Sequence, residues 1–190
     1  MIVLDGKKTS QEIKEEIKHK VTAMKERGIP VPHLAAVLVG NDGASLTYVG
    51  SKVRSCDQIG FKSTLIRLEE QITEEDLMQE IEQLNQDDTL DGFIVQLPLP
   101  KHINEERVLL SINPRKDVDG FHPTNFGRMA LNLDAFIPAT PYGIIQLLER
   151  YKVPTSGKHC VVIGRSHIVG RPISILTVSY THLTLPTNRE

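Results

Sequence analysis

The chain has 190 residues, 39% of them hydrophobic and 24% charged, which suffices for one large domain or for one domain and part of a second. Its 22 basic and 24 acidic residues leave a net charge of −2, so nothing electrostatic favours a nucleic acid or an anionic membrane as partner. The polar N-terminus, the lack of a stretch of roughly 20 apolar residues and two cysteines without metal-type spacing predict a cytoplasmic protein that binds no metal.

Helix and strand patterns alternate along the first two thirds of the chain. With Ser10 as the N-cap, apolar residues at helical spacing predict a helix to about Arg27. The further predicted elements are a strand at 34–40, a helix at 45–60, a strand at 61–68, a helix at 73–85, a strand from 91 that runs into two prolines, and a short helix at 104–112. This alternation is typical of a parallel α/β sheet.

Residues 113–141 have little periodicity and predict a long loop, which is usually functional or inter-domain. A helix is expected from Thr140-Pro141, followed by a second unit from about Gly157. There, residues 158–172 indicate a buried strand, a glycine turn and a helix start, where backbone N–H groups and the helix dipole can hold a pyrophosphate. The glycine spacing is not G-x-G-x-x-G, so a plain strand-to-helix turn is an equal alternative.

Three other stretches place polar groups where a ligand can bind. Tyr48 and Lys52 share one helix face, and Gln96 follows an apolar strand at the end where ligands of open α/β sheets gather. Asp119 ends the D-V-D of the long loop. Each has a simpler structural interpretation: a surface tyrosine and lysine, an amide that caps a strand, and an aspartate that favours a turn before Gly120.

Together, five stretches occur in the order and spacing of one enzyme family. They are YVGSK, GFIVQLPLP, INPRKDVDGFHPTNFGRM, FIPATPYGIIQLL and VVIGRSHIVGRP. From Ile2 to about Leu176 the chain resembles the bifunctional methylenetetrahydrofolate dehydrogenase/cyclohydrolases. The resemblance implies an N-terminal three-layer α/β catalytic domain at 1–139. The linking helix and the first strand-loop-helix of an incomplete Rossmann NAD(P)-binding domain would follow at 140–176.

The resemblance also implies a reaction and its residues. Methylene-tetrahydrofolate is oxidised to methenyl-tetrahydrofolate with NADP, or with NAD in some relatives, and water then opens the product to formyl-tetrahydrofolate. The implied roles are ring packing for Tyr48, the central catalytic group for Lys52, a hydrogen bond to that lysine for Gln96, substrate contact for Leu97 and Pro98, and a pterin anchor for Asp119. Whether Lys52 acts as a base or as a cationic donor stays open.

The same resemblance maps a cofactor loop onto the second unit and implies a homodimer. The residues of that loop are Gly164, Arg165, Ser166, Gly170 and Pro172. A guanidinium suits phosphate geometry, so Arg165 facing a ribose phosphate would favour NADP.

Residues 177–190 are rich in threonine where the family continues with an amphipathic helix, so we expect this tail to be foreign. Without a complete cofactor domain, the chain is expected to be impaired or inactive. Two alternatives are a non-catalytic folate-binding fragment and a shikimate-type two-domain dehydrogenase. The second needs neither Gln96 nor Asp119.

Overall fold

The computed structural model describes residues 3–181, with side chains to residue 178. Its helices are α1 (Gly6–Glu26), α2 (Gly43–Ile59), α3 (Glu74–Gln86), α4 (Glu105–Ser111), α5 (Pro123–Ala130), α6 (Ala139–Arg150) and α7 (Gly170–Thr181). Its strands are β1 (His33–Val39), β2 (Lys62–Leu68) and β3 (Gly92–Val95). They form two compact units, one at Ser10–Val118 and the other made of the described residues on either side of it.

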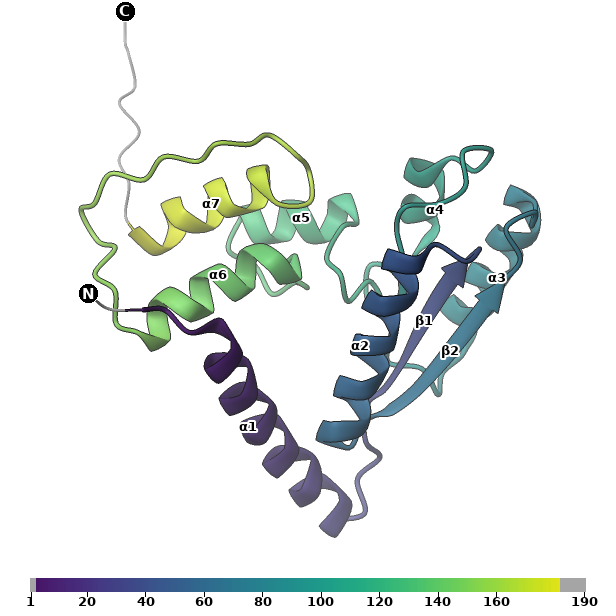
Figure 1. Cartoon of the computed structure of the whole chain (residues 1–190), viewed down its shortest axis with the longest axis horizontal. Helices are drawn as coiled ribbons and strands as arrows, with labels where there is room; N and C mark the ends of the chain where they lie inside the picture. Colours follow the sequence, from purple (N-terminus) through teal and green to yellow (C-terminus); the bar gives the residue numbers. More distant parts are fainter. Residues whose placement is uncertain (1–2, 182–190) are drawn as a thin grey trace, which may run out of the picture. The chain divides into compact units, whose positions relative to one another are not determined.

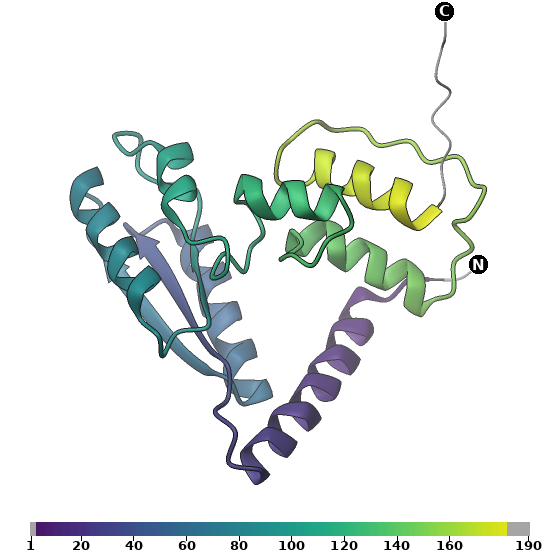
Figure 2. The ribbon, with the colours of Figure 1, turned by 180° about the vertical axis from the view of Figure 1, so that it is seen from behind.

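A three-stranded parallel sheet with strand order β2-β1-β3 forms the centre of the Ser10–Val118 unit. Successive residues of β1 point to opposite faces, because side chains alternate along a strand. Ala36 and Leu38 pack with α2 through Val49, whereas Val37 and its alternate neighbours pack with α3 and α4. Figure 1 shows α2 beside β1 and β2, and Figure 2 shows α3 and α4 from behind. The predicted three-layer parallel α/β arrangement is confirmed.

The N-termini of the helices in this unit are capped by short polar side chains. Thr73 Oγ1 accepts the Asp76 N–H at 3.1 Å at the start of α3, and Asn104 Oδ1 accepts the Arg107 N–H at 3.1 Å at the start of α4. These caps satisfy amide groups that have no partner inside the helix. At the C-terminal end of α2, Gly60 adopts φ +86°, a left-handed conformation that ends the helix where the sequence predicts.

The predicted cap of the first helix is wrong. The helix begins at Gly6, and Asp5 Oδ1 accepts the Lys8 N–H at 3.0 Å, so Asp5 rather than Ser10 is the cap. Ser10 lies inside the helix. A carboxylate at this position also interacts favourably with the positive end of the helix dipole, which explains why the earlier residue caps the helix.

Glu74 links the first turn of α3 to α4. Its carboxylate accepts the Asn104 N–H at 2.7 Å and pairs with Arg107, and its side chain is only 15% exposed. The Asn104 hydrogen bond, with the Arg107 pair as a smaller cause, lowers the pKa of the Glu74 carboxyl below its ordinary value of 4.5. The ionised form is therefore the one that the fold favours.

This shift predicts a pH dependence of stability. The contribution of Glu74 is complete above its unfolded pKa of 4.5 and is lost as the pH falls through the lower folded value. We expect Glu74→Gln to lower the unfolding free energy at pH 7, and the gap from the wild type to close in acid. Urea titrations at both pH values measure the gap. An equal gap at both would contradict the assignment, and Glu80→Gln, on the same helix, is the control.

The other unit contains α5, α6 and α7 around a small apolar core. Met129 of α5, Ile145 of α6 and two residues of α7, Ile173 and Leu176, are its buried members. The predicted loop at 113–141 therefore contains a helix, α5, that sequence periodicity did not indicate. Its start is marked instead by Pro123 in the first turn and by His122, whose Nδ1 accepts the Thr124 N–H at 3.1 Å.

Because Met129 belongs to this core, residues 119–139 group with the helices that follow them, whereas the predicted first domain extends to residue 139. The helix α6 begins at Ala139, one residue before the predicted Thr140 start. Of the helices in the described chain, none has both the length and the apolar character needed to cross a membrane.

The sequence predicts a buried strand at the start of the cofactor unit, and this prediction is wrong. Residues 158–163 form no strand, and the side chains of Val161 and Ile163 are 71% and 98% exposed. The described residues of this unit contain no strand with which the segment can pair, so Val161 and Ile163 stay uncovered, whereas Val162 packs against the core of α5, α6 and α7. The glycine turn and the helix of the predicted strand-loop-helix are present.

Candidate functional site

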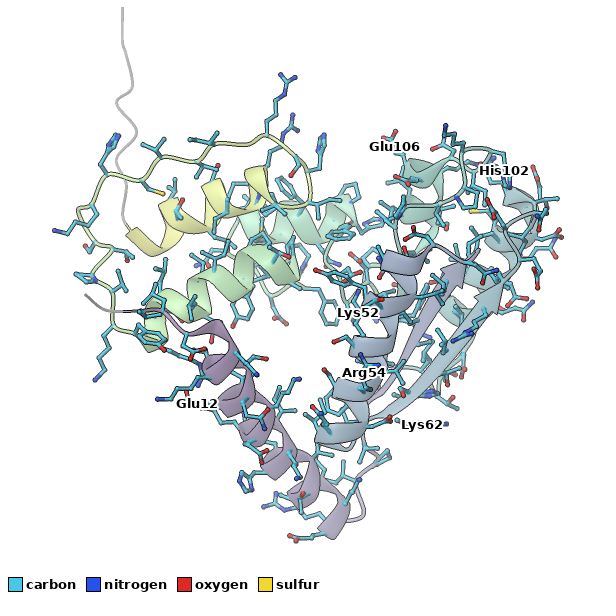
Figure 3. The ribbon with its side chains drawn as sticks, viewed as in Figure 1. Glu12, Lys52, Arg54, Lys62, His102 and Glu106 are labelled. Atoms are coloured by element: carbon cyan, nitrogen blue, oxygen red, sulfur yellow. The ribbon has the colours of Figure 1, made fainter. Side chains whose placement is uncertain are left out.

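The predicted substrate-contact pair lies on α2, which leaves the carboxyl end of β1 after a short turn. Asp42 Oδ2 accepts the Ser45 N–H at 2.8 Å and caps the helix, and this hydrogen bond lowers the pKa of the Asp42 carboxyl. Tyr48 is 67% exposed and Lys52, one turn later, is partly buried. Figure 3 places Lys52 midway along α2. An exposed tyrosine ring beside a lysine offers a flat surface and a hydrogen-bond donor to a ligand.

Gln96 is the first residue after β3, and its backbone continues the sheet. Its N–H donates to Val37 O at 2.9 Å, so it lies at the carboxyl edge of the sheet, beside the end of β1. Its side-chain Nε2 donates to Leu97 O at 2.6 Å, whereas its Oε1 is buried and has no hydrogen-bond partner among the described residues. A buried acceptor without a partner is costly, and such exceptions in native folds often mark functional positions.

The loop after Gln96 is held in place by a hydrogen bond from its backbone. The Leu97-Pro98 peptide bond is cis, and the next N–H, of Leu99, donates to Glu105 Oε1 at 2.9 Å. Because Leu99 is buried, the loop is anchored at the point where it leaves the sheet edge. Leu97 is partly buried and Pro98 is exposed, so the proline faces solvent.

The structure therefore places five predicted residues in one compact unit. They are Tyr48, Lys52, Gln96, Leu97 and Pro98. The predicted hydrogen bond between Gln96 and Lys52 stays a prediction. Asp119 begins the second segment of the other unit, and its expected place at the folate site also stays a prediction.

The predicted nucleotide loop is closed by two glycines. A Cβ added to Gly170 would lie 2.6 Å from the carbonyl carbon of Gly164 and 2.8 Å from the Arg165 nitrogen, so only glycine allows this approach. Gly164 has φ +152°. The loop therefore returns tightly on itself at the start of α7, where the helix N-terminus can bind a phosphate.

The other loop residues have distinct positions. Ser166 Oγ accepts the N–H groups of Val169 at 3.1 Å and Gly170 at 3.2 Å, so its hydroxyl caps the start of α7. Arg165 is exposed and Pro172 is fully buried. Of the predicted cofactor residues, Arg165 thus faces solvent, whereas Ser166 and Pro172 build the turn. Within the described residues, no cluster of three or more His, Cys, Asp or Glu side chains is placed to hold a metal ion.

Sequence reasoning missed residues that build the site without touching a ligand. Gly92 opens β3, and a Cβ there would lie 2.3 Å from Val118 Cγ1 and 3.1 Å from Lys116 O. Lys116 forms two hydrogen bonds to α3. Glycine inside a strand is a signal of close backbone approach and would have pointed to Gly92. No sequence signal indicated Lys116.

Comparison with known proteins also divides the chain into two parts. Residues 4–119 match the family model "Tetrahydrofolate dehydrogenase/cyclohydrolase, catalytic domain", and residues 138–186 match that of the NAD(P)-binding domain of the same enzymes. The second match passes residue 177, where the expected foreign tail begins, and α7 extends to Thr181. The limits of that tail stay a prediction.

Several relatives and solved structures resemble the chain along most of its length. "Bifunctional protein FolD" of Flavobacterium johnsoniae is 67% identical, and the match covers 96% of this chain and 65% of that protein. FolD of Campylobacter jejuni has a TM-score of 0.92 and 46% identity, covering 95% of this chain and 64% of that one. The Trypanosoma brucei enzyme, solved with NADP and an inhibitor, has a TM-score of 0.90 and 31% identity, covering 95% and 62%.

The chain thus spans about 65% of the length of its curated relatives. The catalytic-domain model matches more than half of its residues, from the start of α1 through the sheet to Asp119. The chain therefore belongs to the tetrahydrofolate dehydrogenase/cyclohydrolase family.

Proposed function

We propose that this chain binds a tetrahydrofolate and carries the residues for two steps: NADP-dependent oxidation of methylene-tetrahydrofolate to methenyl-tetrahydrofolate, and hydrolysis of that product to formyl-tetrahydrofolate. The observation that carries the proposal is the buried, unpartnered Oε1 of Gln96 at the carboxyl edge of the sheet. It occurs in a chain whose residues 4–119 match the catalytic-domain model of the family.

Two side chains would hold the folate. The exposed ring of Tyr48 would stack on the folate ring system, and the two carboxylate oxygens of Asp119 would accept hydrogen bonds from the amino-pyrimidine edge of the pterin. A bidentate anchor and a stacking surface fix orientation, which lowers the entropic part of a reaction barrier. Leu97 and Pro98 would border the substrate beside Gln96.

In the hydrolytic step, a water oxygen forms a bond to the methenyl carbon. One of the water protons is released, and the other passes to the ring nitrogen whose bond to that carbon breaks. Lys52 is the group proposed to assist, either as the base that takes the proton or as a cationic donor. The Gln96 Nε2 already donates to Leu97 O, whereas its Oε1 has no partner among the described residues. Gln96 would therefore accept an N–H of Lys52 and hold that amine in place.

The turn from Gly164 to Gly170 is tight, because a Cβ on Gly170 would meet the Gly164 backbone, and the start of α7 that follows would hold a phosphate of a dinucleotide. NADP, when bound, accepts the hydride from the substrate. Arg165, which is exposed, would contact a phosphate and favour NADP over NAD, while Ser166 and Pro172 shape the turn. A homodimer in the cytoplasm, with no nucleic-acid or membrane partner, completes the proposal.

The direct test is to purify the 190-residue chain, titrate it with a tetrahydrofolate analogue and follow NADP-dependent oxidation of methylene-tetrahydrofolate. We expect folate binding with turnover below about 0.01 s⁻¹, compared with the 1–10³ s⁻¹ of typical enzymes. The reason is that residues 158–163, which lead into the cofactor turn, form no strand and expose Ile163.

Each outcome separates the alternatives. Binding without any turnover supports the non-catalytic folate-binding fragment, which the uncovered segment at 158–163 favours. Ordinary enzyme rates would support the two-step function and contradict the expected impairment. Failure to bind folate would contradict the proposal and favour the shikimate-type alternative.

A further inference from the structure

Lys116 is a lysine without a role in the proposed chemistry that nevertheless holds two parts of the sheet unit together. Its Nζ donates to Leu84 O at 2.9 Å and to Asp87 O at 2.7 Å. Leu84 lies in the last turn of α3 and Asp87 is its C-terminal cap. Carbonyl groups at the end of a helix have no partner inside it and carry the negative end of the helix dipole, so an ammonium group is well matched to them.

The backbone of the same residue is fixed to the edge of the sheet. Lys116 O accepts the Phe93 N–H of β3 at 2.9 Å, and Asp117 forms an isolated parallel bridge with Phe93. Asp117 is only 2% exposed. Next to this bridge, Gly92 has no side chain to keep Val118 away. Residues 116–118 therefore lie beside β3 in a single register and extend the sheet at that edge. The strand β3 leads directly to Gln96.

Asp119 follows Val118 in the chain, and the residue after Asp119 is also closely packed. Gly120 adopts φ +69°, and a Cβ there would lie within 2.9 Å of backbone atoms of Phe136, Ile137 and Pro138. Asp119 thus lies between two closely packed residues, Val118 and Gly120. The register of 116–118 on β3 sets the point from which the Asp119 segment leaves the sheet.

We propose that Lys116 is a positioning residue for the folate site. By donating hydrogen bonds to carbonyl groups at the end of α3, its ammonium group fixes the register of 116–118 on β3 and so the place of Asp119. The link to folate rests on the proposed function, whereas the link between Lys116 and the register does not. Lys116 itself touches no substrate in this scheme.

The test compares Lys116→Met, which keeps the aliphatic stem and removes the donors, with Lys116→Arg, which restores donors at the same place. Lys62→Met is the control, because Lys62 is an exposed lysine on β2 with no side-chain partner of this kind. Two quantities are measured on the full chain: the dissociation constant for a tetrahydrofolate analogue, and hydrogen exchange at the amides of Phe93 and residues 117–120. The amide of Val37 in β1 is the internal reference for general loss of stability.

We expect Lys116→Met to weaken folate binding about tenfold and to speed exchange at Phe93 and 117–120 about tenfold relative to Val37, because misplacement of an anchor by 1 Å can cost even more. Lys116→Arg should recover most of both, and Lys62→Met should change neither. Unchanged exchange in Lys116→Met would overturn the proposal, as would faster exchange with unchanged folate affinity. If the wild-type chain binds no folate, the proposed function fails, and the exchange result alone decides whether Lys116 sets this register.

Discussion

Replacing Gly120 by alanine is expected to destabilise the unit that contains α5, α6 and α7 by about 3 kcal/mol. An L-residue in the left-handed region costs about 1–2 kcal/mol, and overpacking adds about 1–3 kcal/mol. Both apply here, because Gly120 has φ +69° and its added Cβ would lie 2.6 Å from Phe136 O and 2.8 Å from the Pro138 nitrogen. These are backbone atoms, which cannot rotate away.

Urea unfolding of the variant and the wild type measures this loss. Gly127→Ala is the matched control, since Gly127 lies inside α5, and a Cβ there meets nothing within 4 Å. Alanine inside a helix is favoured over glycine by about 0.5–1 kcal/mol, so the control should be neutral or stabilising. Equal stabilities of Gly120→Ala and Gly127→Ala would show that the close approach at Gly120 is not needed.

Replacing the neighbouring Asp119 by asparagine is expected to weaken binding of a tetrahydrofolate analogue about 100-fold. Asparagine has nearly the same shape, but it offers one acceptor and turns an N–H donor toward the N–H groups of the pterin edge. A charge-assisted, bidentate contact of this kind is about twice as strong as a neutral one, and each tenfold in affinity corresponds to about 1.4 kcal/mol.

Titration calorimetry of the two proteins measures the change, with the unfolding midpoint as a check that the fold is intact. Asp88→Asn is the control, because Asp88 is an exposed aspartate at the end of α3, outside the proposed site. If Asp119→Asn binds the analogue as tightly as Asp88→Asn does, Asp119 is not the pterin anchor. Together, the two predictions separate the chemical role of D-V-D-G from its geometric role.

The sequence predicted the sheet unit well, because its signals there are local. Short apolar runs predict β1 and β3, the acidic first turn after Thr73 predicts α3, and Gly60 predicts the end of α2. Each of these depends on residues that are close in the chain. The same locality explains the wrong cap of α1, since Asp5 and Ser10 are both acceptable caps, and the helix extends to the earlier one.

The candidate site could be predicted only in part. The spacing of Tyr48 and Lys52 and the place of Gln96 after a strand were visible in the sequence, but each was as consistent with a simple structural role. The resemblance to one family, carried by five motifs, made them candidates together. The helix α5 was missed because its apolar residues are few and its start depends on His122, an uncommon cap.

By itself, the sequence determined the order of helices and strands in the sheet unit, the parallel sheet and the residue types of the site, since these depend on periodicity, caps and turn residues within a few positions. Only the tertiary structure decided which groups lack partners and which backbones touch. The buried Gln96 Oε1, the Lys116 contacts with α3, the closure of Gly164 on Gly170 and the uncovered segment at 158–163 all depend on residues brought together, or left apart, by packing. Hydrogen bonding and steric exclusion act over a few ångströms in space, whatever the separation along the chain, so these features could not be read from the sequence.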